Sequence, residues 1–151
     1  MKKESVTQLK EEFVSFEIAK LAKEKGFDEF CRKCFNEKGE SEGFSGYAYM
    51  KEYNKNSTVH FIDTNSEEFE YPKIVCTQPT QSLLQMWLRK VHCIEVLPSF
   101  NDNNTYDYYY FIHTNISKAN SNRICSLPKN YNSYEKALEA GLKEALKLIK
   151  S

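Results

Sequence analysis

The sequence predicts a mixed α+β fold, in which an N-terminal helix plus hairpin is followed by a helix, three antiparallel strands and a final helix. Three stretches, which begin near Ser15, Thr80 and Ser133, carry apolar residues at helical spacing directly after a good capping residue. Between the helices, short segments rich in aromatic and β-branched residues are typical of strands, and the strongest is YDYYYFIH at 106–113. With 151 residues, of which 40% are apolar, the chain can bury a core without disulfides or metal.

The first helix is predicted over residues 16–25. Ser15 is a good N-cap, and Ile18 lies on one face with the apolar residues that follow at helical spacing. Gly26 stands where a left-handed residue ends a helix, and Phe27 supplies the hydrophobic contact that closes this motif. These signals set both ends of the helix.

A hairpin is predicted after this helix. Residues 29–35 form a short strand, 36–40 a turn and 44–53 the returning strand. Residues 54–71 are polar and acidic, so we expect a long loop there. Residues 74–76 are then a short extended piece.

The stretch PTQSLLQMWLRKVHCIEV predicts a core helix that runs into a strand. Thr80 caps the helix, and Leu84 and Trp87 recur at helical spacing, so we expect Trp87 to pack in the core. Residues 93–97 continue as a strand. Pro98 opens the loop that follows.

The segment YDYYYFIH has large aromatic side chains on both faces of its strand, and 123–127 is the third strand. Because side chains alternate between the faces, Tyr109 and Phe111 point away from the face that carries the other tyrosines. One face must lie under the two helices. The other is either covered by the N-terminal unit or exposed as a platform that anchors a protein partner or stacks bases. The candidate partner-binding residues are Tyr106, Tyr108 and Tyr110.

The last helix begins after the cap Ser133 and carries a stripe that includes Leu138 and Leu142. Gly141 lies within this helix, where glycine costs about 1 kcal/mol against alanine. We therefore expect Gly141 to allow close approach of a neighbouring element. The chain divides into an N-terminal helix and hairpin subdomain with its acidic loop at residues 1–75, and an αβββα domain at residues 76–151.

Charge and composition limit the function classes. The 21 Lys and Arg balance the 21 Asp and Glu, whereas a general nucleic-acid binder usually carries a basic excess. No apolar run is long enough for a membrane span, and no signal peptide is visible after the first lysines, so we expect no membrane partner. The odd number of cysteines, five, favours reduced thiols and a cytoplasmic location.

No catalytic, metal or cofactor site is predicted. Cys31 and Cys34 form a CxxC pair, which is half of a zinc site by spacing, but no second pair follows. His92 and Cys93 are adjacent in what we expect to be a helix end and a strand, so they cannot form a nucleophile and base pair. No GxSxG, phosphate loop or HExxH occurs. The sequence therefore predicts a protein that is not an enzyme.

The predicted helix, three strands and helix resemble the topology of double-stranded-RNA-binding domains. Such domains hold phosphates with lysines at the start of the last helix and with a loop after the first strand. Here the last helix opens with Glu135 and only Lys136, and the loop at 101–105 has no basic residue. Nucleic-acid binding is therefore the alternative function, and its candidate residues are Arg89, Lys90, Arg123 and Lys129.

The stretches at 13–31, 79–96 and 133–150 resemble a set of small proteins that phages and prophages of gut Bacteroides-type bacteria encode. That family carries no assigned activity, so the resemblance implies context and no catalytic residues. It implies an intracellular accessory protein linked to a phage. We therefore expect a non-catalytic module that binds a host or phage protein, or a second copy of itself as a homodimer.

Overall fold

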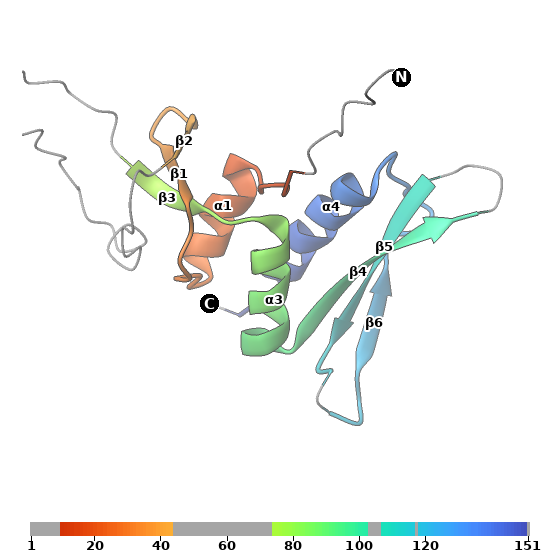
Figure 1. Cartoon of the computed structure of the whole chain (residues 1–151). Helices are drawn as coiled ribbons and strands as arrows, with labels where there is room; N and C mark the ends of the chain where they lie inside the picture. Colours follow the sequence, from red (N-terminus) through yellow and green to blue (C-terminus); the bar gives the residue numbers. More distant parts are fainter. Residues whose placement is uncertain (1–9, 44–73, 103–106, 117, 151) are drawn as a thin grey trace, which may run out of the picture.

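The computed structural model describes residues 10–43, 74–102, 107–116 and 118–150 (Figure 1). These residues form three helices and two antiparallel three-stranded sheets, which confirms the predicted α+β class. In chain order the elements are α1 (Phe16–Glu24), β1 (Lys33–Asn36), β2 (Ser41–Gly43), β3 (Ile74–Gln78), α3 (Gln81–His92), β4 (Ile94–Asn101), β5 (Asp107–Thr114), β6 (Asn122–Cys125) and α4 (Tyr134–Lys147).

Helix α1 has the ends that its sequence predicts. Gly26 takes a φ of 90°, and the N–H of Phe27 donates to the carbonyl of Ala22 at 2.9 Å, which closes the expected C-terminal motif. Ser15 holds the N-cap position, but its hydroxyl makes no capping hydrogen bond. Its backbone N–H donates instead to the Glu139 carboxylate at 2.8 Å. The start of α1 is therefore tied to α4, far along the chain.

The first sheet has the order β2-β1-β3, with β1 in the middle. The predicted strand at 29–35 begins later, at Lys33, and its returning partner begins at Ser41. The predicted returning strand at 44–53 and the loop at 54–71 lie outside the described residues. The hairpin itself is therefore confirmed, with different strand ends.

Asn36 fixes the turn of this hairpin. It is fully buried, and its side-chain oxygen accepts from the N–H groups of Lys38 at 2.9 Å and Glu40 at 3.0 Å. Its amide nitrogen donates to the carboxylates of Glu40 and Glu42. Every polar atom of the buried side chain is thus paired, as a buried amide requires.

The second sheet has the order β4-β5-β6 and is entered from α3. The Thr80 hydroxyl accepts from the N–H of Leu83 at 3.1 Å, so the predicted cap of α3 is confirmed. Strand β4 continues through Pro98 to Asn101, beyond the predicted end at residue 97. A proline fits there because β4 lies at the sheet edge, where a missing N–H disturbs the ladder least.

Helix α4 packs on β4 and β5, and it also contacts α3 and α1. The Ser133 hydroxyl caps it by accepting from the N–H of Lys136 at 3.1 Å. A Cβ placed on Gly141 would lie 2.6 Å from Cγ1 of Val96 and 3.1 Å from Cγ of Tyr110. The glycine therefore permits close approach of α4 to the sheet, as the sequence predicts.

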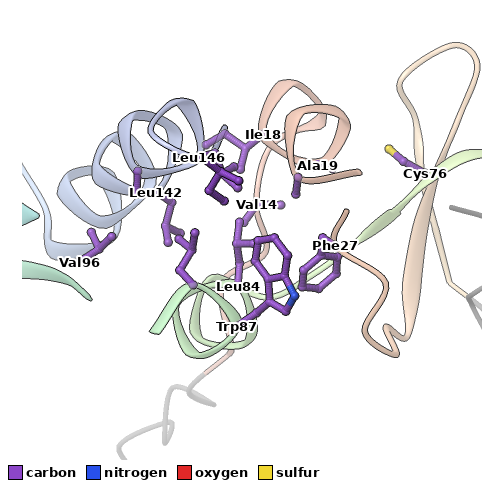
Figure 2. Close-up of a cluster of buried hydrophobic side chains, with 14 of the residues drawn as sticks. Val14, Ile18, Ala19, Phe27, Cys76, Leu84, Trp87, Val96, Leu142 and Leu146 are labelled. Carbon is purple, nitrogen blue, oxygen red and sulfur yellow. The ribbon is translucent and has the colours of Figure 1, made fainter. Parts of the chain in front are cut away.

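One hydrophobic core joins the two halves of the chain. Figure 2 shows Phe27 beside Trp87 of α3, with side chains of α1 and α4 around them, and the two rings lie 5.3 Å apart. The expected core position of Trp87 is thus confirmed. The boundary that we predicted between residues 75 and 76 falls inside β3, which pairs with β1 and contacts α1.

Candidate functional site

The candidate site is the outer face of the β4-β5-β6 sheet, which is the face turned away from α3 and α4. Both helices contact the sheet from the same side (Figure 1). The inner face carries Val96, Tyr110 and Ile112, which are buried beneath them. Among the described residues no helix lies over the other face.

A ladder of rings runs along the outer face of β5. Tyr109 and Phe111 have ring centroids 5.2 Å apart, and the Phe111 and His113 rings are 6.2 Å apart. All three side chains are half-buried. Leu97 extends the apolar surface on β4, where it is 43% exposed, and Cys125 is exposed beside Phe111 on β6.

Charged groups of this face lie on both edge strands, and Asp107 lies at the start of the central strand β5. Glu95 of β4 stands opposite His113 of β5, which in turn stands opposite Arg123 of β6. The Arg123 guanidinium lies over the Phe111 ring at 4.8 Å. Glu95 also accepts from Nη1 of Arg89 in the last turn of α3, at 3.1 Å. The face therefore offers an apolar centre between an acidic and a basic edge.

The three predicted partner-binding tyrosines have different surroundings in the structure. Tyr110 is only 7% exposed, lies against Gly141, and burial raises the pKa of its hydroxyl to about 12. Tyr108 is half-buried between Phe100 and the Tyr134 ring. Tyr106 lies outside the described residues. Tyr110 thus belongs to the core, whereas Tyr108 is half-buried, as are Tyr109 and Phe111 of the opposite parity.

One signal in the sequence distinguishes the two faces. Asp107 and His113 share the strand parity of Tyr109 and Phe111, and a charged or polar residue at each end of a strand face indicates solvent. The other parity has Tyr108 and Thr114 at its ends and includes the aliphatic Ile112, which is fully buried.

The four basic candidates for nucleic-acid binding do not form one patch. Arg89 is bound to Glu95, and its neighbour Lys90 is exposed on α3. Lys129 lies over the Tyr131 ring, and Tyr131 pairs with Tyr108 near the start of β5. Arg123 lies opposite His113, which is five residues further along β5 than Tyr108. That separation is about 16 Å along a strand.

The CxxC cysteines are held as thiols in the core between α1 and the first sheet. Burial raises the pKa of Cys31 and of Cys34 to about 12, and that of the nearby Cys76 to about 11. The Cys31 thiol donates to the backbone carbonyl of Glu29, and the Cys34 thiol donates to that of Glu42. In the part of the chain that the structure describes, no three His, Cys, Asp or Glu side chains gather as a metal site.

His92 and Cys93 lie at the end of α3, and Cys93 differs from expectation. Cys93 takes a left-handed conformation with φ 55°, so it closes the helix and does not begin the strand. His92 is the last helical residue, as expected. Burial lowers its pKa, and its ring lies 4.5 Å from the Trp87 ring.

Comparisons of the chain with protein-family models, with curated proteins and with solved structures find no match. The resemblance to small phage proteins therefore stays an expectation. Among the described helices, none combines the length and the apolar character that a membrane crossing needs.

Proposed function

We propose that the chain is a non-catalytic protein-binding module that uses the outer face of the β4-β5-β6 sheet. The observation that carries this proposal is the ring ladder of Tyr109, Phe111 and His113, with Leu97 beside it, on a face that no described helix covers. Aromatic residues in a contiguous apolar patch with a charged rim are typical of protein interfaces.

The state of the reactive side chains supports binding over turnover. Cys31, Cys34 and Cys76 stay protonated because burial raises the pKa of each. Burial lowers the pKa of His92, whose ring packs on Trp87 in the core. The proposal keeps the cytoplasmic location and the phage context that the sequence leads us to expect, with a phage protein, a host protein or a second copy as partner.

The test compares two matched variants in which glutamate replaces an exposed apolar residue. Leu97→Glu places a charge in the outer face, whereas Val91→Glu changes a residue of α3 that is 57% exposed and lies outside that face. Each tagged chain is used to capture proteins from the lysate of a Bacteroides-type bacterium, and the captured proteins are identified by mass spectrometry. We expect one protein to be enriched by the wild type and by Val91→Glu, and to be lost with Leu97→Glu. Equal enrichment by all three chains would contradict the proposal.

Binding of single-stranded nucleic acid is the second candidate function. One observation favours it: Arg123 lies over Phe111 within a ladder of rings on which bases can stack. The electrostatics of the face weigh against it, because Glu95 and Asp107 share the face and Arg89 is already bound to Glu95. A nuclease-treated arm of the capture experiment separates the two functions, since enrichment through nucleic acid disappears there and falls steeply with salt.

A further inference from the structure

We infer that the outer face binds a second copy of the chain, with the two β4-β5-β6 sheets packed face to face about a two-fold axis parallel to β5. This inference rests on the proposed function, because it names the partner of the same face. The arrangement of side chains in two cross-strand rows carries it.

The first row is charged. It contains Glu95 on edge strand β4, His113 on β5 and Arg123 on edge strand β6, at the same end of the sheet. A two-fold axis along β5 places β4 of one copy over β6 of the other. It leaves the position of each residue along the strand direction unchanged. Arg123 of the second copy then lies over Glu95, and the reverse contact forms at the other edge. Each contact of a two-fold interface must occur twice in this way.

The second row is apolar and matches itself under the same rotation. It contains Leu97 on β4, Phe111 on β5 and Cys125 on β6. The rotation places Leu97 of one copy over Cys125 of the other, and the two Phe111 rings meet near the axis. Within these two rows, apolar groups thus face apolar groups, and opposite charges face each other at the two edge strands. Sheets pack face to face in this way in β-sandwiches.

The charges present in one copy allow the contact. Glu95 accepts from Nη1 of Arg89 at 3.1 and 3.3 Å, and its side chain remains 16% exposed. A carboxylate has about four lone-pair sites, so it can accept a second guanidinium. The chain carries no net charge, and two copies therefore do not repel each other as they approach.

Charge reversal tests this geometry in solution, with sedimentation velocity as the measurement on the full chain. We expect the wild type to be a dimer, and Arg123→Glu to weaken its self-association at least tenfold. Glu95→Lys is expected to do the same. A mixture of these two variants is expected to form a mixed dimer, because each contact then joins a lysine or arginine to a glutamate. Lys90→Glu, a charge reversal on α3 outside the face, serves as the control and is expected to stay dimeric.

A crosslink gives a second test that does not disturb the charges. Leu97→Cys lies two strands from Cys125 of its own chain, about 9–10 Å away, which is too far for a disulfide. Across the inferred interface the two residues face each other. Mild oxidation with diamide, which takes up two electrons and two protons per disulfide, is expected to give a covalent dimer. Leu97→Cys combined with Cys125→Ser is expected not to crosslink.

The outcomes separate the inference from the proposed function. A wild type that sediments as a monomer at high micromolar concentration overturns the inference, as does a failure of the two charge variants to combine. If Leu97→Glu still loses a captured protein in that case, the face binds a different protein and the proposed function holds. A monomer that retards single-stranded DNA in a salt-dependent manner overturns both.

Discussion

His92 makes stability depend on pH. Its Nε2 is buried, and no described residue bonds to it, so burial lowers its pKa below the value of about 6.5 that an unfolded chain has. The unfolded chain therefore takes up a proton more readily than the folded one. This linkage leaves stability intact above about pH 6.5 and reduces it as the pH falls below that value. We expect the urea midpoint, followed by the fluorescence of Trp87, to drop between pH 7.5 and 5.5.

The control for this prediction removes the titrating group. His92→Phe keeps a ring beside Trp87 and has no proton to bind, so we expect its urea midpoint to change less over this pH range. A His92→Phe protein that loses stability as steeply as the wild type would show that another group is responsible.

Gly141 is the residue at which a single methyl group has the largest predictable effect. Alanine stabilises a helix by about 1 kcal/mol over glycine, but here the added Cβ lies 2.6 Å from Val96, which is fully buried. Overpacking of this kind costs about 1–3 kcal/mol, so we expect Gly141→Ala to lower the free energy of unfolding. Urea titration measures the change. Adding Val96→Ala to Gly141→Ala should cost less than Val96→Ala alone costs the wild type, because the two changes share one space.

At the scale of elements, Glu139 connects α4 to the start of α1 and to α3. Its two oxygens accept from the N–H of Ser15 and from the amide of Gln81, which is buried. Glu139→Ala leaves both donors short of a partner, and we expect a loss of about 1–2 kcal/mol. Hydrogen exchange of the α1 amides should rise most. Glu139→Gln retains an acceptor oxygen, so its α1 amides should exchange at rates between those of the wild type and of Glu139→Ala. Equal exchange rates in all three proteins would rule out this role of Glu139.

The first sheet protects its cysteines from thiol reagents. Cys31, Cys34 and Cys76 are buried with raised pKa values, whereas Cys125 on β6 is exposed. We expect a maleimide at pH 7.5, added at a protein concentration low enough for the chain to be monomeric, to label Cys125 within the first minutes and the buried three only after urea is added. Peptide mass spectrometry identifies the labelled sites. Rapid labelling of Cys34 in the native protein would mean that β1 and β3 separate often.

Local signals predicted the helices, and contacts distant in sequence decided the rest. Thr80, Ser133 and Gly26 act within a few residues of themselves, so their caps were readable directly from the chain. The ends of the strands could not be read from local sequence in this way. Strand β4 can include Pro98 because β4 lies at the edge of its sheet, and the sequence around Pro98 does not show that position. The burial of Tyr110 depends on the packing of α4, although Asp107 and His113 on the opposite face of β5 already indicate the side that meets solvent.

At the scale of the whole molecule, α4 is the element that both halves share. It contacts α1 on one side and β4 and β5 on the other, and residues from all of these elements enter one core. The outer face of the β4-β5-β6 sheet lies on the far side from this contact (Figure 1). Changes such as Leu97→Glu should therefore alter binding without loosening the core.

The position of α4 in the chain has a consequence for synthesis. A ribosome makes the chain from its N-terminus, so α1 and the first sheet emerge before the helix on which α1 packs. The N–H of Ser15 has its acceptor, the Glu139 carboxylate, only after a further 124 residues have been made. The part of α1 that packs on α4 thus stays uncovered until translation passes α4, even after β3 has covered another part, and a chaperone can bind it during this interval.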